Sequence, residues 1–465
     1  MLKRIPRIVQ ILLGLAVLAL LAIGLYFVPP VHSRLAWRVH DLRTNIIYFF
    51  NPPQKVTFQP SGQSQSTPTV AVPTLVSTAT PTSTPLPTDQ ATDTPTITST
   101  PVPGSVILAN VPFVDQMNAW NYCGPANLTM ALEYWGWKGD PSSVYSPRDQ
   151  VGIAIKPGVD DPSLPYYSRS QSDVNVMPYE MVDFVNQQTT NKALFRYGGD
   201  LDLLKRLIAA GFPVITEKGI YESLPPENTM QWAGHYAFTT GYDDVQKDFI
   251  WQDSYLPPAK PVGKNTKTSY DDYLSGWRAF NYVFIVIYPA DRETELDQVL
   301  GPWADQYWAA QHALDIANQE IQSNALSGND LFFAMFNKVT SDINLQNPDY
   351  GPAAAAYDQA NGYFNNTLSA SDDKPLPYRI MWYETAPYSA YYYTGRYQDV
   401  INLAEANLKR IQATRSLEES WFWESRAEYA LGAYDTAYAD MRQALHFHPN
   451  FQPALDMFAL WGVSP

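Results

Sequence analysis

The stretch that decides the fold is residues 111–137, VPFVDQMNAWNYCGPANLTMALEYWGW, which contains the single cysteine of a 465-residue chain. Cys123 is followed by Gly124 and Pro125, and then by apolar residues spaced as one face of a helix that Gly136 would end. Because proline is favoured at the first helical position, Cys123 is expected at the N-terminal end of this helix. The helix dipole and the unpaired N–H groups there stabilise a thiolate, so the pattern predicts a nucleophile.

A lone cysteine in a large chain is more often a small buried apolar residue than a catalyst. The composition of the surrounding region favours the catalytic interpretation. Residues 104–289 contain no other cysteine and only one histidine, His235. Nucleophile and base candidates are therefore both unique within this region.

His235 begins the segment HYAFTTGYDD, and the chain then continues to KDFIWQD, which ends at Asp253. The two segments predict a hairpin within residues 236–252, with Thr239 opposite Phe249 and His235 opposite Asp253. Directly opposed residues have Cβ atoms about 5 Å apart, close enough for a carboxylate to orient an imidazole. The two aspartates of the predicted turn are interpreted as turn residues.

The segments QMNAWNYCGPANL, GHYAFTTGYDD and WQDSY resemble the signature blocks of the papain-like, double-glycine leader (bacteriocin-processing) cysteine peptidases. The resemblance covers residues 106–289 and implies a papain-like fold. It also implies that Cys123 is the nucleophile, His235 the base and Asp253 the group that orients the imidazole. Gln116 would complete the oxyanion hole, where a side-chain amide donates without titrating. No cofactor or metal is implied.

The chain lacks the G-x-x-x-x-G-K-[ST] motif of nucleotide-binding domains, whereas the classical family members are fused to a transporter with such a domain. The resemblance therefore extends to the thiol chemistry and not to the leader-peptide substrate.

The fold class predicted for residues 104–290 is α+β, with helices packed on an antiparallel sheet. Tryptophans 120, 232 and 277 are expected to pack in the core, or else to line a cleft. The helices are expected at 125–135, 178–186 and 200–210, and the strands at 213–217, 236–242, 249–252 and 282–288.

The N-terminal third predicts a membrane protein. Residues 8–28 form an apolar run long enough to span a bilayer, so 1–29 is expected to be a signal-anchor helix rather than a cleaved signal peptide. Residues 30–56 predict an amphipathic juxtamembrane segment, and 57–103, rich in Ser, Thr and Pro, predict a linker. The predicted localisation is the cell membrane, single-pass, with the catalytic domain extracytoplasmic.

Residues 291–465 predict an all-α tetratricopeptide-like array that binds a peptide or protein partner, or that only supports the catalytic domain. Helices are expected at 353–364 and 451–461. His446 and His448 are expected to be exposed rather than metal ligands. The tetratricopeptide pattern is matched at Trp421, Gly432, Tyr434, Ala437, Ala444 and Pro449.

The sequence thus predicts a membrane-anchored extracytoplasmic cysteine peptidase that acts on peptide or protein substrates through an acyl-enzyme. Two alternatives stay open: a non-catalytic surface adaptor, and a transferase that passes the acyl group to an amine. A net charge of −15 argues against a nucleic-acid partner.

Overall fold

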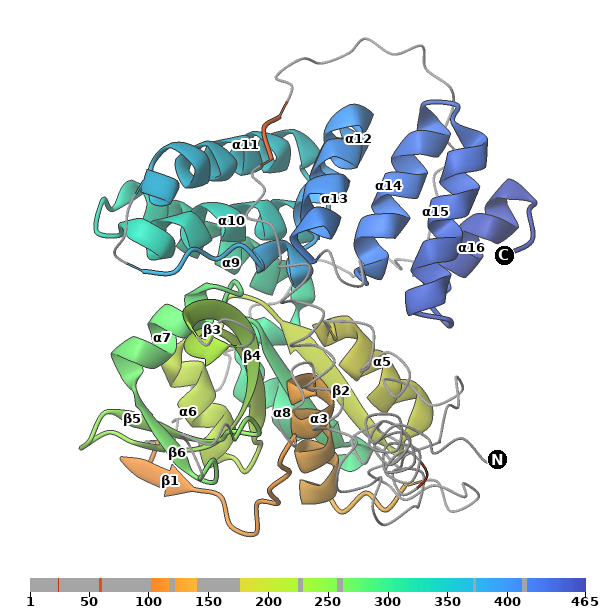
Figure 1. Ribbon diagram of the computed structural model, residues 1–465. Helices are drawn as coiled ribbons and strands as arrows, with labels where there is room; N and C mark the ends of the chain where they lie inside the picture. The colour runs from red at the N-terminus through yellow and green to blue at the C-terminus, as the bar shows by residue number, and fades with distance from the viewer. Residues whose placement is uncertain are drawn as a thin grey trace, which may run out of the picture.

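The computed structural model describes residues 24, 58–60, 102–116, 122–139, 176–224, 229–256, 262–370, 374–411 and 416–465. The part of the molecule that combines the sheet with helices, called here the α/β part although its class is α+β, lies below a layer of helices, as Figure 1 shows. Within the described residues, we find no helix whose length and apolar character would let it cross a membrane. Apart from Gly24, the predicted membrane segment lies outside these residues, as does most of the predicted linker.

The α/β part is built on one sheet in which every strand pairing is antiparallel. The strand order is β2-β7-β3-β4-β5-β6, and β1 pairs with β4 outside this path. The strands are β1 Ser105–Ile107, β2 Asn191–Arg196, β3 Val214–Leu224, β4 Thr229–Asp243, β5 Asp248–Gln252, β6 Thr266–Ser269 and β7 Phe284–Pro289.

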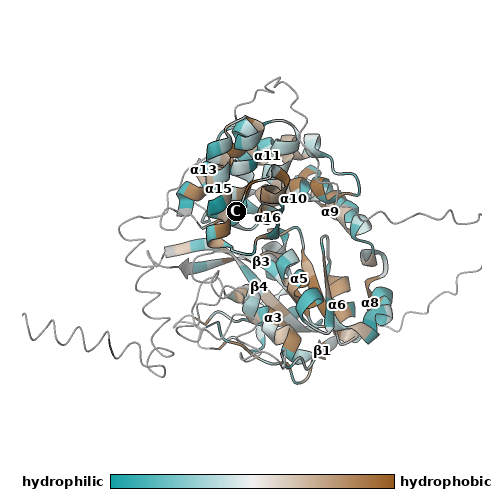
Figure 2. Cartoon of the chain, turned by 90° about the vertical axis from the view of Figure 1, so that its right-hand side faces the viewer, coloured by the Kyte–Doolittle hydropathy of each residue, from teal (hydrophilic) through white to brown (hydrophobic). Residues whose placement is uncertain are grey.

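Helices cover both faces of this sheet, and alternating apolar residues in its strands decide which face each helix meets. In β7, Ile285 packs with α3 (Cys123–Tyr134) and α5 (Pro178–Gln188), whereas Val286 packs with α6 (Leu201–Ala209) on the opposite face. The helices α7 (Tyr270–Arg278) and α8 (Glu293–Leu300) also lie on the α6 side. Figure 2 shows α5 and α6 beside the strands, with hydrophobic and hydrophilic stretches along each helix. The predicted α+β class with an antiparallel sheet is confirmed.

All three helices predicted in this part form. Asp200 caps α6 by accepting the N–H of Leu203, and Gly211, with φ +85°, follows its end. Strands β1, β2 and β6 and helix α7 were not predicted. Trp277, on α7, is fully buried in the core, and Trp120 lies outside the described residues.

The C-terminal part is all-helical, and each helix packs mainly on its neighbour in the chain. Gly395 and Gly432, with φ +75° and +85°, form the turns before α13 and α15. Tetratricopeptide identity stays a prediction. The helices of this array are α9 Gln306–Gln322, α10 Gly328–Asn344, α11 Tyr350–Asn366, α12 Ala386–Tyr393, α13 Tyr397–Ile411, α14 Glu418–Ala430, α15 Tyr434–Phe447 and α16 Gln452–Trp461, with short 3-10 helices at Ala290–Arg292, Gly301–Ala304, Leu368–Ala370 and Ile380–Trp382.

Trp232 of β4 joins the array to the sheet. Its ring stacks on Phe280 at 6.0 Å and lies 5.5 Å from the ring of Phe333 on α10 and 6.2 Å from that of Tyr383. Only 2% of Trp232 is exposed, so this indole packs in the core between the two parts. The array is therefore part of the same body as the strand that carries His235.

Candidate active site

Cys123 is the first residue of α3, and its side chain is half-buried. Strand β5 pairs with β4 only from Phe238 onward and therefore does not cover the edge of β4 before that residue. The N-terminal end of α3 lies along this edge. The amide of Asn127 holds it there by donating to the backbone carbonyls of Cys123 at 2.7 Å and Tyr236 at 3.1 Å. The sulfur accepts hydrogen bonds from the backbone N–H groups of Gly124 and Tyr236. It also forms a hydrogen bond with the His235 side chain.

His235 and Asp253 form a buried pair, each with 4% of its side chain exposed. The imidazole Nε2 lies 2.9 Å from Asp253 Oδ1. Since Nε2 faces the carboxylate, the bond to Cys123 uses the other ring nitrogen, Nδ1. The structure thus brings together Cys123 and His235, which are 112 positions apart in the sequence, and Asp253, which follows His235 by 18 positions.

The strand register that led to this pairing is wrong by two residues at Thr239 and by three on the turn side of Gly241. Thr239 lies opposite Trp251 rather than Phe249, because the turn is longer than predicted and a bulge interrupts the ladder between Thr239 and Gly241. At the His235 end the shift is two residues, which keeps the side chains there on the predicted face of the sheet. His235 and Asp253 lie beyond the last pair of the two strands, Phe238 with Gln252, and their side chains still meet.

The electrostatics of the three groups favour an ion pair between sulfur and imidazole. Burial raises the pKa of the Cys123 thiol, but the hydrogen bond and charge of His235, with the two backbone N–H groups, lower that pKa below its usual value overall. Burial lowers the pKa of His235, and the charge and hydrogen bond of Asp253 more than offset this, raising the pKa to about 9. A thiolate and an imidazolium are hence favoured near neutral pH.

Gln116 is also buried at this site, with 2% exposed. Its backbone N–H donates to the carbonyl of Ser254 at 2.9 Å, and the Ser254 hydroxyl donates to Gln116 Oε1 at 2.7 Å. Oε1 is thereby fixed as the acceptor, which assigns Nε2 to the donor side of the amide. Ser254 directly follows Asp253, so one strand end positions both the carboxylate and the amide.

Sequence reasoning missed Ser254 and Asn127. Asn127 follows Cys123 by four residues, one helical turn, which is the only signal that would have placed it beside the thiol. Ser254 carries no signal beyond its position next to Asp253.

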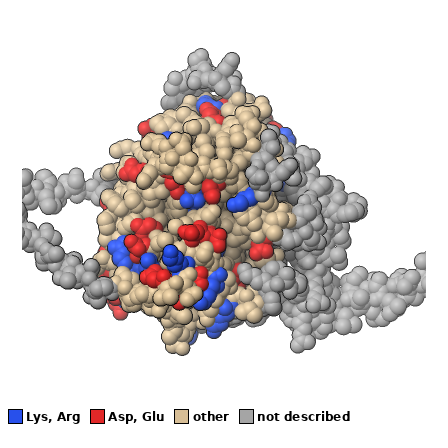
Figure 3. Space-filling view, turned by 90° about the vertical axis from the view of Figure 1, so that its left-hand side faces the viewer, with Lys and Arg blue, Asp and Glu red and all other residues tan. Residues whose placement is uncertain are grey.

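A cavity of ≈ 350 Å³ adjoins the histidine and the aspartate. Lys218, with 4% exposed, lies beside His235 on β3, its Nζ 3.5 Å from the centre of the Trp251 ring. The array contributes Asp330 and Phe333 of α10 to the wall. Figure 3 shows charged side chains gathered on the face where the array meets the α/β part. The remaining lining residues are Gly219, Ile220, Tyr221, Glu222, Trp232, Tyr255, Thr268, Asp272, Ser275, Gly276, Ala279 and Lys374.

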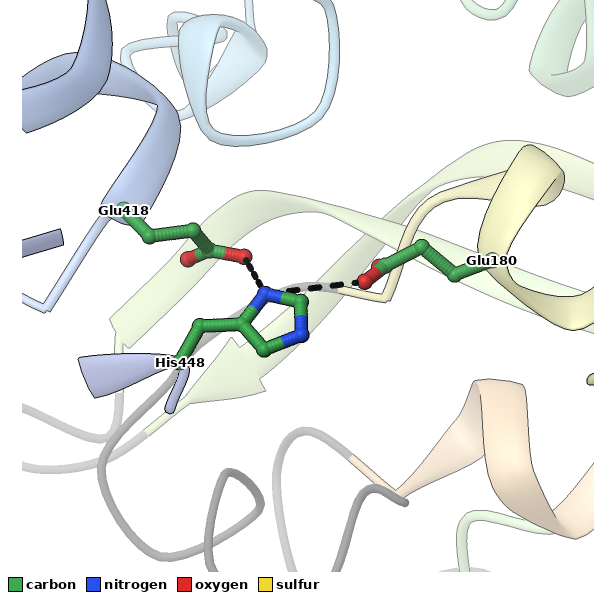
Figure 4. Close-up of side chains that lie close together, drawn as sticks. All are labelled: Glu180, Glu418 and His448. Atoms are coloured by element: carbon green, nitrogen blue, oxygen red, sulfur yellow. Dashed lines mark hydrogen bonds and ion pairs between the residues drawn. The ribbon is translucent and has the colours of Figure 1, made fainter. Parts of the chain in front are cut away.

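His448, predicted to be exposed, is instead largely buried between the two parts of the molecule. Its Nδ1 lies 3.2 Å from Glu418 Oε1 and 3.8 Å from Glu180 Oε1, as Figure 4 shows. The possible metal-ligand atoms of these three residues, one ring nitrogen and two carboxylate oxygens, lie within 4.8 Å of one another. A cation would also fit this spacing. An ion pair of the imidazolium with the two carboxylates accounts for the same geometry. A second set of this kind joins Glu424, Glu428 and Asp440.

The comparison with protein families agrees with this geometry. Residues 108–285 match the model of the Peptidase_C39 like family. That match covers the α/β part with its thiol, imidazole and carboxylate, and leaves the array outside. A solved structure from Bacillus anthracis, described as a C39-like peptidase, is 18% identical with a TM-score of 0.28, covering 39% of this chain and 96% of that chain. No curated protein matches the chain.

Proposed function

We propose that this protein is a cysteine peptidase that acts on peptide substrates through an acyl-enzyme. The observation that carries the proposal is the continuous set of contacts from Cys123 through His235 to Asp253. The family match of residues 108–285 supports peptidase chemistry. We further propose that residues 8–28 anchor the protein in the cell membrane with the catalytic part outside, as the apolar run and the linker composition suggest.

In the proposed reaction, the Cys123 thiolate attacks the scissile carbonyl carbon. Gln116 Nε2 and the Cys123 backbone N–H donate to the oxyanion that forms. The His235 imidazolium then gives its Nδ1 proton to the leaving amine as the carbon–nitrogen bond breaks. A water molecule that His235 deprotonates attacks the thioester, and the acid product leaves with the thiolate restored. Asp253 stabilises the imidazolium throughout.

The cavity beside His235 is assigned to the leaving-group side of the substrate, because the imidazole must reach the leaving nitrogen. Its walls combine the aromatic rings of Trp232, Trp251 and Phe333 with charged side chains, among them Lys218 and Asp330, and suit a polar aromatic side chain. Since Phe333 belongs to α10, the array takes part in substrate selection in this proposal.

The test is alkylation of Cys123 by iodoacetamide across pH, followed by mass spectrometry, in the full chain and in the His235→Ala variant. We expect labelling that persists below pH 7 and weakens without the histidine. The Cys123→Ala variant controls for other sites of labelling. Hydrolysis of a peptide library, lost in Cys123→Ala, would establish the peptidase. A thiol that titrates like free cysteine, with no change in His235→Ala, would favour the non-catalytic adaptor instead.

A further inference from the structure

Phe58 lies in the segment that the sequence assigns to a linker, but it is buried within the helical array, with only 3% exposed. Its ring stacks on Tyr357 at 6.4 Å and lies 6.0 Å from the ring of Tyr391. Phe58 belongs to the same hydrophobic cluster as the residues that α10, α11, α12 and α13 turn toward one another. In Figure 1 this short piece of chain lies against α11 and α12.

The array also binds the backbone of Phe58. Its carbonyl oxygen accepts from Asn361 Nδ2 at 3.0 Å and from Asn365 Nδ2 at 2.7 Å. The two asparagines are four residues apart on α11 and so lie on one face of the helix. Two amide donors on a single carbonyl hold the main chain of the bound segment, and they do so whatever its side chain is.

The ring and hydrogen-bond contacts described for Phe58 come from the array, and other array residues brace them. Tyr391, which is fully buried, donates its hydroxyl to Asp358 Oδ1 at 2.6 Å, and Arg396 binds the same carboxylate at 2.7 and 3.1 Å. The Arg396 guanidinium lies 4.0 Å from the centre of the Tyr391 ring. The aromatic wall is therefore held in place by contacts that do not involve Phe58, which leaves it preorganised for a ligand.

We propose that this pocket is a peptide-binding site for an extended segment centred on an aromatic residue, and that Phe58 is its resident, exchangeable ligand. Residues 61–101, rich in Ser, Thr and Pro, separate Phe58 from β1 in the sequence. Release of Phe58 would free roughly 40 residues with a reach on the order of 120 Å at about 3.1 Å per residue. An external peptide that takes the pocket would thus change how far the catalytic part stands from the residues before Phe58. This inference does not depend on the thiol chemistry.

The test uses the full chain and a fluorescein-labelled peptide, QKVTFQPSG, which corresponds to residues 54–62. Fluorescence anisotropy would compare its binding to the wild type and to Phe58→Ala. We expect binding to the variant at least about tenfold tighter than to the wild type, where the tethered Phe58 competes at high effective concentration. The matched control is the same peptide with alanine in place of phenylalanine, which we expect to bind at least about tenfold more weakly to the variant.

Phe58→Leu is a second variant that keeps apolar volume in the pocket and guards against loss of folding. We expect the peptide to bind it with an affinity between those of the wild type and Phe58→Ala. Alkylation of Cys123 at the wild-type rate would report that each variant is folded. Equal binding to all three chains, or no binding to either folded variant, would overturn the proposal, because Phe58 would then be a fixed core residue and not a ligand.

Discussion

The Asp253→Asn substitution should abolish the low-pH reactivity of Cys123. The contact of 2.9 Å with Asp253 is the main factor that raises the pKa of His235 from its usual 6.5 to about 9 against the effect of burial. That rise corresponds to about 3 kcal/mol in favour of the imidazolium. Without the carboxylate, only the contact with Cys123 opposes the effect of burial, and the pKa of the imidazole falls. The thiolate then lacks its counter-charge near neutral pH, and the pKa of the Cys123 thiol rises.

At pH 6.5 a thiol with a pKa of about 8.5 is only about 1% ionised. We therefore expect the alkylation rate of Asp253→Asn to fall on the order of ten- to a hundredfold at pH 6.5, and only several-fold at pH 9.5. Iodoacetamide labelling followed by mass spectrometry from pH 5 to 10 measures this directly. Asp291→Asn, at an exposed position of the chain, is the matched control and should keep the wild-type profile. An unchanged profile in Asp253→Asn would refute the assigned role of the carboxylate.

Three further predictions concern the groups around this pair. Ser254→Ala removes the hydroxyl that fixes the Gln116 amide, so the rate of p-nitrophenyl ester hydrolysis should fall about tenfold. The rate of Cys123 alkylation, which forms no oxyanion, should stay unchanged, and equal losses in both rates would contradict this role. Gly234→Ala places a Cβ 2.7 Å from the Phe280 ring, so the free energy of unfolding measured in urea should decrease by about 1–3 kcal/mol. Burial raises the pKa of Glu384 from 4.5 to about 7, so the free energy of unfolding should decrease by about 3 kcal/mol as the pH rises from 4.5 through 7, and Glu384→Gln should remove that slope. If the difference in the free energy of unfolding between the wild type and Glu384→Gln stays constant across this pH range, this carboxyl is not held neutral.

The active-site residues were identifiable because their chemistry is rare in this chain. One cysteine at a helix start, one histidine in the same domain and an aspartate at the end of the next strand leave few combinations. The exact register was not identifiable, because nothing in the residue types announces the bulge near Thr240. The residue pair survived that error because a two-residue shift preserves the face of a strand.

Other predictions failed where burial depends on distant segments. His448 was expected in solvent because it follows a helix end, but Glu180 of the α/β part and Glu418 of the array enclose it. Phe58 was assigned to a linker because the composition around it is polar, yet α11 and Tyr391 provide it with a pocket. In each case both partners are at least 30 residues away in the sequence, where periodicity gives no information.

What the sequence by itself determined is local: the helix that begins at Cys123, the strand periodicity around His235, and the capping and ending of helices such as α6 by Asp200 and Gly211. These depend on backbone propensity and on apolar spacing within one element. Tertiary structure alone decided that Ser254 orients Gln116, that α10 forms a wall of the cavity, and that Phe58 docks on the array. These contacts join segments whose separation in space is set by packing of the whole body, and no local pattern encodes it.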